Sequence, residues 1–180
     1  SASLRQALQD MPEIAELSKH IMIEETKQGL NIEIMDQNGR SMFPEGSKEP
    51  YERTRLLVQR IAGQLKPLPY RVSVAGHTSA TKQARSPGYG PWELSADRAN
   101  ASRRALVQGG LADNKILRVV GLASAAHLDR ADPFNPINRR ISIIVMNKRT
   151  EENVLRDGGK LQVGLDTEAT QAAAAAAPAA

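Results

Sequence analysis

Two short stretches hold residue types that together could bind an anionic ligand. Gly76-His77-Thr78-Ser79 follows an apolar run that predicts a strand, and Trp92-Glu93-Leu94-Ser95-Ala96-Asp97-Arg98-Ala99 opens a predicted helix. Backbone N–H groups and the helix dipole favour an anion at a helix N-terminus. Arg98 adds a planar, permanently charged guanidinium that fits a carboxylate. The pattern indicates a carboxylate pocket; the competing interpretation is that Arg98 only forms a surface ion pair, which is the more common role of such an arginine.

Other chemistry has weaker support in the residue types. The chain has 3 His and no Cys, and no spacing suits a metal site. For His77 we expect a local hydrogen bond at the strand end, and the helix dipole already explains Asp97. Ser79 and Ser95 have no His and Asp partners in the sequence context that nucleophilic catalysis would need. We therefore predict a binding module that is not an enzyme and uses no metal or cofactor.

The elements that position these residues follow from hydrophobic spacing. Leu30, Ile32 and Ile34 alternate with polar residues and predict a strand, and the turn after it is expected to fold Arg40–Phe43 back as a short return strand. The same rules predict helices over 50–65 and 91–108 and strands over 72–76, 116–120 and 141–145. This order indicates an α/β two-layer sandwich, with a mixed four-stranded sheet and helices on one face.

The two ends of the chain are predicted to differ from this middle part. Residues 1–28 are expected to form an N-terminal linker helix whose two apolar stripes are separated by Pro12; the stripes are Leu4, Leu8 and Met11, and Ile14, Leu17 and Ile21. Two interpretations stay open: the helix packs on its own domain, or it pairs with a partner chain. Residues 29–150 form the globular domain, and 151–180 read as a largely disordered extension.

Composition narrows the class of partner. The net charge of +4 suits an anionic ligand, but aromatic residues make up only 3% and Trp92 is the sole tryptophan, which argues against a single-stranded nucleic-acid binder. No apolar run reaches eighteen residues, so no membrane span is predicted. The chain opens on Ser1, which we interpret as a fragment or a processed chain.

The two stretches resemble the OmpA-like peptidoglycan-binding family, and within it the MotB-type branch of flagellar stator proteins, whose pattern is G-H-T-D followed by N-W-E-L-S-x-x-R-A. The resemblance continues through Leu117–Gly121 and Asn138–Ser142 and covers about residues 30–150. In that family the T-D aspartate and the L-S-x-x-R arginine hold the zwitterionic end of diaminopimelate. The arginine corresponds to Arg98, whereas Ser79 stands in place of the aspartate and Pro91 in place of the family's asparagine.

The resemblance implies a non-catalytic module that binds peptidoglycan and anchors the flagellar stator around the rotor. The site residues it suggests are Thr78, Ser79, Trp92, Leu94, Ser95, Arg98 and Arg139. It also implies three partners: peptidoglycan (through diaminopimelate of the stem peptide or through the glycan), a second copy in a homodimer, and a MotA-type channel subunit. The expected place is the periplasmic part of a single-pass inner-membrane protein whose transmembrane segment lies outside this chain. The alternative is a general OmpA- or Pal-type envelope anchor unrelated to motility, against which the W-E-L-S-A-D-R-A string argues.

Overall fold

Five strands form one mixed sheet in the computed structural model, which describes residues 2–17, 19–37, 39–80 and 87–156. The strands are β1 (Ile21–Thr26), β2 (Gly29–Met35), β3 (Val72–His77), β4 (Ile116–Gly121) and β5 (Arg140–Met146). Their order across the sheet is β1-β2-β5-β3-β4. Strands β3 and β4 run parallel, and the other neighbours are antiparallel. The predicted α/β class with a mixed sheet is confirmed, with five strands in place of four.

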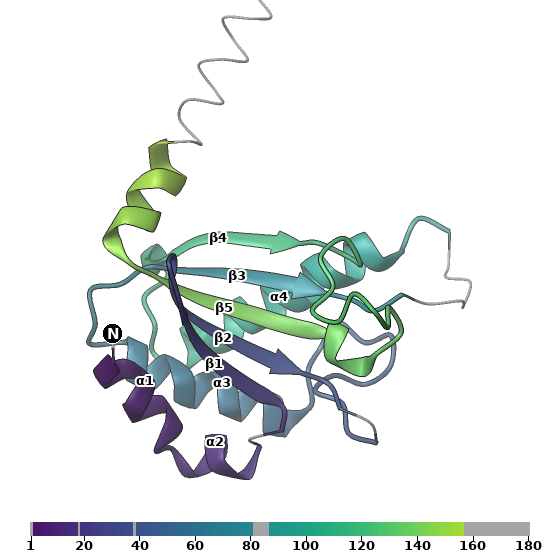
Figure 1. Cartoon of the computed structure of the whole chain (residues 1–180), viewed down its shortest axis with the longest axis horizontal. Coiled ribbons are helices and arrows are strands. Elements are labelled where there is room, and N and C mark those ends of the chain that lie inside the picture. The colour runs from purple at the N-terminus through teal and green to yellow at the C-terminus, as the bar shows by residue number, and fades with distance from the viewer. Residues whose placement is uncertain (1, 18, 38, 81–86, 157–180) are drawn as a thin grey trace, which may run out of the picture. The chain divides into compact units, whose positions relative to one another are not determined.

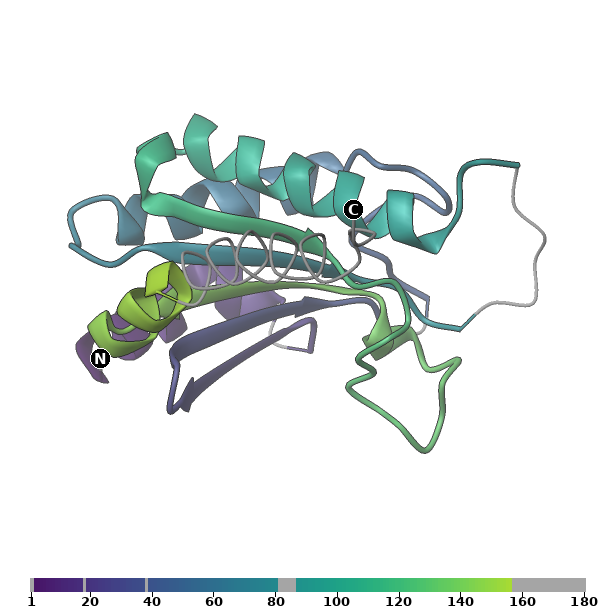
Figure 2. The ribbon, with the colours of Figure 1, turned by 90° about the horizontal axis from the view of Figure 1, so that it is seen from above.

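Helices α3 (Glu52–Leu65) and α4 (Pro91–Gln108) cover one face of this sheet (Figures 1 and 2). The apolar positions of α3 recur at helical spacing, so Leu57 and Ile61 both point into the core. Small residues such as Ala99 and Ser102 line the buried side of α4 and let its backbone lie close to the sheet. The core lies between these helices and the alternating apolar residues of the strands.

The N-terminal segment differs from its prediction. Among its described residues, the helical ones lie in α1 (Ala2–Gln9) and α2 (Pro12–Glu16). Strand β1 then pairs with β2 through a tight hairpin. The prediction of a helix over 1–28 is therefore wrong from Ile21 onward, because Ile21 and Ile23 alternate inward opposite Ile34 and Ile32 of β2. The six residues of both apolar stripes are buried in the same core as the sheet. The segment thus packs on its own domain.

One smaller prediction also needs correction. Residues 40–43 do not form a return strand: a single bridge joins Gln37 to Arg40, and the chain then continues as a loop to α3. Pro44 and the hydrogen bonds that Met42 makes outside the sheet explain why no ladder forms.

The chain divides after Asn147, and Lys148–Ala180 is a second unit. Its residues 148–156 are helical, and 151–156 of these belong to the extension that the sequence predicts to be largely disordered. The alanine run and the rest of that prediction lie outside the described residues. Within the part of the chain that the structure describes, no helix is long and apolar enough to cross a bilayer.

Candidate functional site

The end of β3, the first turns of α4 and the loop after β4 are bonded to one another. Ser95, which is 0% exposed, donates to the carbonyl of Trp92 and accepts from the backbone N–H of Ala123, both at 3.1 Å. The carbonyl of Ala123 in turn accepts the N–H of Thr78 at 2.8 Å. Ala123 has a φ of 48°, a left-handed conformation that a non-glycine residue rarely adopts. These bonds fix the backbone at Thr78.

Two glycines allow α4 to approach the sheet this closely. A Cβ atom at Gly76 would lie 2.0 Å from the carbonyl oxygen of Ser95, and one at Gly121 would lie 2.4 Å from the amide nitrogen of Ala96. Any side chain at either position would push the helix away from the strand ends. The glycines therefore set the position of α4, and with it that of Arg98.

Arg98 lies buried beneath the loop that precedes α3. Its Nε donates to the carbonyl of Ser47 at 2.8 Å and its Nη2 to the carbonyl of Pro44 at 3.2 Å. The guanidinium carbon lies 4.7 Å from the centroid of the Phe43 ring. With 7% of the residue exposed, Arg98 is not the solvated surface side chain of the competing interpretation. It organises residues 43–47 and brings a positive charge beneath them.

Arg139 approaches the same region from the start of β5. Its Nε donates to the carboxylate of Asp36 at 2.9 Å, and its Nη1 donates to the hydroxyl of Ser79 at 3.3 Å. The Asp36 carboxylate also accepts the N–H of Met42 at 2.8 Å. The Asp36 side chain is 6% exposed and that of Arg139 is 33% exposed. Asp36 thus holds a guanidinium whose other edge faces Ser79 and solvent.

A small cavity lies between the two arginines. Asp36, His77, Arg98, Arg139 and Arg140 are among its lining residues, and its volume is about 10 Å³, room for about one water molecule. Burial, and then the charge of Arg140, lower the pKa of His77 to about 4, so the imidazole is neutral at pH 7. Its Nδ1 is buried with no partner among the described contacts, so this atom does not make the local hydrogen bond expected from the sequence.

Residues 42–139 match the model of the OmpA family. The chain belongs to the OmpA family. It is 43% identical over 162 residues to Motility protein B of Escherichia coli K12, covering 88% of this chain and 52% of the relative. It is 30% identical over 146 residues to the putative truncated flagellar export/assembly protein LafU of the same strain, covering 81% of this chain and 69% of that protein. The chain thus spans about half the length of Motility protein B.

Solved structures share the fold of this OmpA-family chain. The periplasmic domain of Helicobacter pylori MotB superposes with a TM-score of 0.64 at 23% identity, covering 86% of this chain and 93% of that one. The cell wall anchor of the T6SS from Pseudomonas aeruginosa gives a TM-score of 0.61 at 22% identity, covering 76% and 95%. These likenesses support the OmpA-like sandwich predicted from the sequence.

The predicted site residues of this OmpA-family chain differ in how far they are exposed to a ligand. Leu94 and Ser95 are 1% and 0% exposed, so they offer no surface to a ligand and instead position α4. Trp92 is 59% exposed and stands at the start of the helix. The hydroxyl of Thr78 is buried without a partner among the described contacts. Ser79, Arg98 and Arg139 converge as described above.

Sequence reasoning missed two residues that build this end of the OmpA-like domain. Asp36 lies at the turn that follows the strand of Leu30, Ile32 and Ile34, where the sequence gives no sign of a binding role, yet it is the counter-charge of Arg139. Asn138 is 0% exposed, accepts the N–H of Asp129 at 2.8 Å and donates to the carbonyl of Asp132 at 3.0 Å. Its position directly before Arg139 and Arg140 in the sequence is the signal that could have pointed to it. Among the described residues, no group of three or more His, Cys, Asp or Glu side chains could hold a metal ion.

Proposed function

We propose that this chain is a non-catalytic peptidoglycan-binding module that anchors a flagellar stator to the cell wall. Membership of the OmpA family and 43% identity to Motility protein B support the proposal. The observation that carries it is the convergence of Arg98 and Arg139 on one end of the sheet, beside Ser79. Two guanidinium groups there create a positive potential suited to a carboxylate of the stem peptide, such as that of diaminopimelate.

We propose that the two arginines have different roles in ligand binding. Arg139 is one-third exposed and already oriented by Asp36, so its outer edge can bond a ligand carboxylate without first losing much conformational freedom. Arg98 uses two donors on backbone carbonyls and contributes mainly its charge and the shape of the 43–47 loop. Ser79 supplies a hydroxyl at the same edge, Thr78 lies buried beside it, and the exposed ring of Trp92 offers a contact for the glycan or the peptide.

Ser79 affects how strongly this site can bind the ligand's ammonium group. Its hydroxyl accepts a bond from Arg139 but carries no charge to balance an ammonium. We expect Ser79→Asp to supply that charge next to Arg139, so that an aspartate–arginine pair faces the opposite charges of the zwitterion. Binding to sacculi should then tighten. Weaker or unchanged binding would mean that this chain holds the wall without using the zwitterion.

We also propose a location and partners for this chain, and this proposal is based on its relatives. Neighbouring structures are periplasmic domains of MotB, and we infer the same place for this domain, as part of a single-pass inner-membrane protein. A homodimer and a MotA-type channel partner complete the proposed stator. No part of this assignment involves nucleic acid or a cofactor.

Co-sedimentation with purified peptidoglycan sacculi tests the proposal. The wild type should pellet with sacculi and release no soluble muropeptides over time. Arg139→Gln should weaken binding by roughly one to two orders of magnitude, since a charge-assisted hydrogen bond contributes about 1.5–3 kcal/mol. Arg60→Gln, which removes a charge from a side chain of α3 that is 70% exposed, is the matched control. Equal binding by wild type and Arg139→Gln, or the appearance of soluble fragments, would overturn the proposal.

A further inference from the structure

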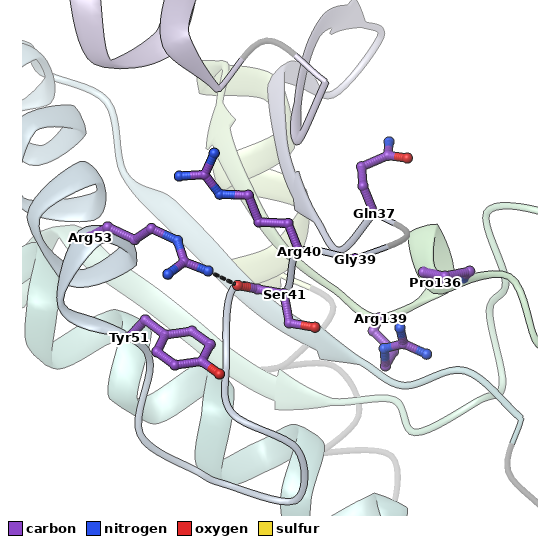
Figure 3. A pocket seen from close by; sticks show the side chains of 8 residues that line it. All are labelled: Gln37, Gly39, Arg40, Ser41, Tyr51, Arg53, Pro136 and Arg139. Atoms are coloured by element: carbon purple, nitrogen blue, oxygen red, sulfur yellow. Dashed lines mark hydrogen bonds between the residues drawn. The ribbon is translucent and has the colours of Figure 1, made fainter.

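A second, larger hollow lies on the other side of Arg139. It has a volume of about 570 Å³, is open to solvent, and is lined by the 37–41 turn, the start of α3 and the residues before β5 (Figure 3). We call it the basic hollow, after the three arginines that line it: Arg40, Arg53 and Arg139. Because Arg139 also borders the small cavity beside Arg98, the basic hollow adjoins the candidate site.

The charges of the basic hollow are unbalanced. No Asp or Glu is among its lining residues. Arg139 forms an ion pair with Asp36, whose side chain is 6% exposed. Arg40 is exposed and forms no ion pair with the residues that the structure describes. In Figure 3 the side chains of Arg40 and Arg53 extend toward each other, one from the 37–41 turn and the other from α3. Arg40 and Arg53 form no ion pair with the described residues, and two such positive charges attract an anion.

Arg53 is held in place. Its Nη2 donates to the carbonyl of Ser41 at 2.5 Å, and its guanidinium carbon lies 4.5 Å from the centroid of the Tyr51 ring. Its Nε is buried with no hydrogen-bond partner among the described residues. A fixed and partly desolvated guanidinium exerts a stronger field than a solvated one, and it loses little freedom when an anion binds. Arg53 is therefore a preformed element of an anion site.

We propose that the basic hollow is a second subsite for peptidoglycan, which binds another carboxylate of the same stem peptide. This inference rests on the proposed function, since it takes the wall polymer as the ligand. The stem peptide carries several carboxylates, and Arg139 borders both sites. A ligand with one carboxylate near Ser79 and Arg139 can therefore reach Arg40 and Arg53 with the next.

Arg40→Gln is the decisive variant, because Arg40 is exposed and its side chain makes no hydrogen bond or ion pair with the described residues, so its loss leaves the fold intact. In the sacculus titration we expect roughly tenfold weaker binding, the loss of one charge-assisted contact. Arg60→Gln makes the same change of net charge on α3, away from the basic hollow, and should bind as the wild type does. Wild type and Arg40→Gln should bind equally well to sacculi whose carboxylates have been amidated.

The outcomes separate the two proposals. Equal binding by wild type and Arg40→Gln, with Arg139→Gln weakened, would overturn the second subsite and leave the proposed function standing. Failure of the wild type to bind sacculi would overturn both. Competition by free stem peptide should depend on Arg40. If inorganic phosphate competes as well as the peptide does, the basic hollow is a general anion site and the assignment to a stem-peptide carboxylate is wrong.

Discussion

Removing the charge of Glu33 tests the buried polar network beneath the candidate site. Glu33 is 4% exposed, and its carboxylate accepts hydrogen bonds from Arg140 Nε at 3.2 Å, Ser142 Oγ at 2.5 Å and Asn31 Nδ2 at 3.0 Å. Burial lowers the pKa of Arg140, and the charge of Glu33 opposes that shift. Glu33 is thus the counter-charge that lets Arg140 stay ionised inside the protein.

Glu33→Gln keeps the shape of the side chain and leaves the buried Arg140 guanidinium without its counter-charge. Removing one member of a buried pair costs about 3–5 kcal/mol of the free energy of unfolding. Since glutamine retains one acceptor oxygen, we expect the lower end, about 3 kcal/mol. A domain of this size loses about 2–4 °C of Tm per kcal/mol, so the Tm should fall by roughly 9 °C.

Thermal unfolding followed by circular dichroism at neutral pH measures this fall. The matched control is Glu52→Gln, which breaks an ion pair with Arg55 on the surface of α3, where the Glu52 side chain is 65% exposed. Exposed pairs contribute little, so the Tm of the control should change by less than about 2 °C. If the two variants melt at the same temperature, the Glu33–Arg140 pair does not stabilise the fold and our reasoning about its burial is wrong.

Three further changes test other parts of the structure by thermal unfolding. Gly76→Ala should destabilise the domain by at least about 2 kcal/mol, because its Cβ would lie 2.0 Å from a backbone oxygen of α4. The control Gly63→Ala, in open space on α3, should stabilise the domain by about 0.5–1 kcal/mol. A change of the same sign in both variants would refute the argument that α4 lies too close to Gly76 for a side chain. Leu8→Ala, at a position 0% exposed, should lower the free energy of unfolding by about 2–5 kcal/mol. Leu56→Ala, at a position 49% exposed, should lower it much less. If Leu8→Ala leaves the stability unchanged, α1 does not belong to the core. Because the pKa of His77 is lowered from 6.5 to about 4, the unfolded chain takes up a proton before the folded one, so stability should fall as the pH drops from 6.5 towards 4. His77→Gln should lose less Tm than the wild type between about pH 7 and pH 5, and an equal loss would exclude His77 as the cause.

Much of the fold was predictable from hydrophobic spacing and from punctuation by Pro and Gly. Helix α4 begins at Pro91 and ends before Gly109, as predicted. Strand β1 was missed because Ile21 fits two patterns: it continues the helical spacing of Ile14 and Leu17, and it also alternates with Ile23. Periodicity alone cannot separate these patterns over so short a run, and pairing with β2 decides in favour of the strand.

The candidate site was less predictable, because its geometry depends on loops. The sequence pointed to Arg98, but only the conformation of the 43–47 loop shows that two backbone carbonyls take its donors. The pairing of Asp36 with Arg139 joins residues far apart in the chain, and no local pattern encodes it. The basic hollow likewise combines Arg40, Arg53 and Arg139 from three separate segments. In the sequence Arg40 and Arg53 look like ordinary surface charges, and only the family resemblance pointed to Arg139.

The position of β5 in the sheet has a consequence for the order of folding during synthesis. Although β5 is the last of the described strands to leave the ribosome, it lies between β2 and β3 and pairs with both. Until it emerges, the β1–β2 hairpin and the parallel β3–β4 pair share no strand ladder, and their apolar faces stay only partly covered. Arg139 and Arg140 arrive at the head of this same strand. The step that closes the sheet is therefore also the step that delivers both arginines to the candidate site, so a nascent chain cannot present that site before its sheet is complete.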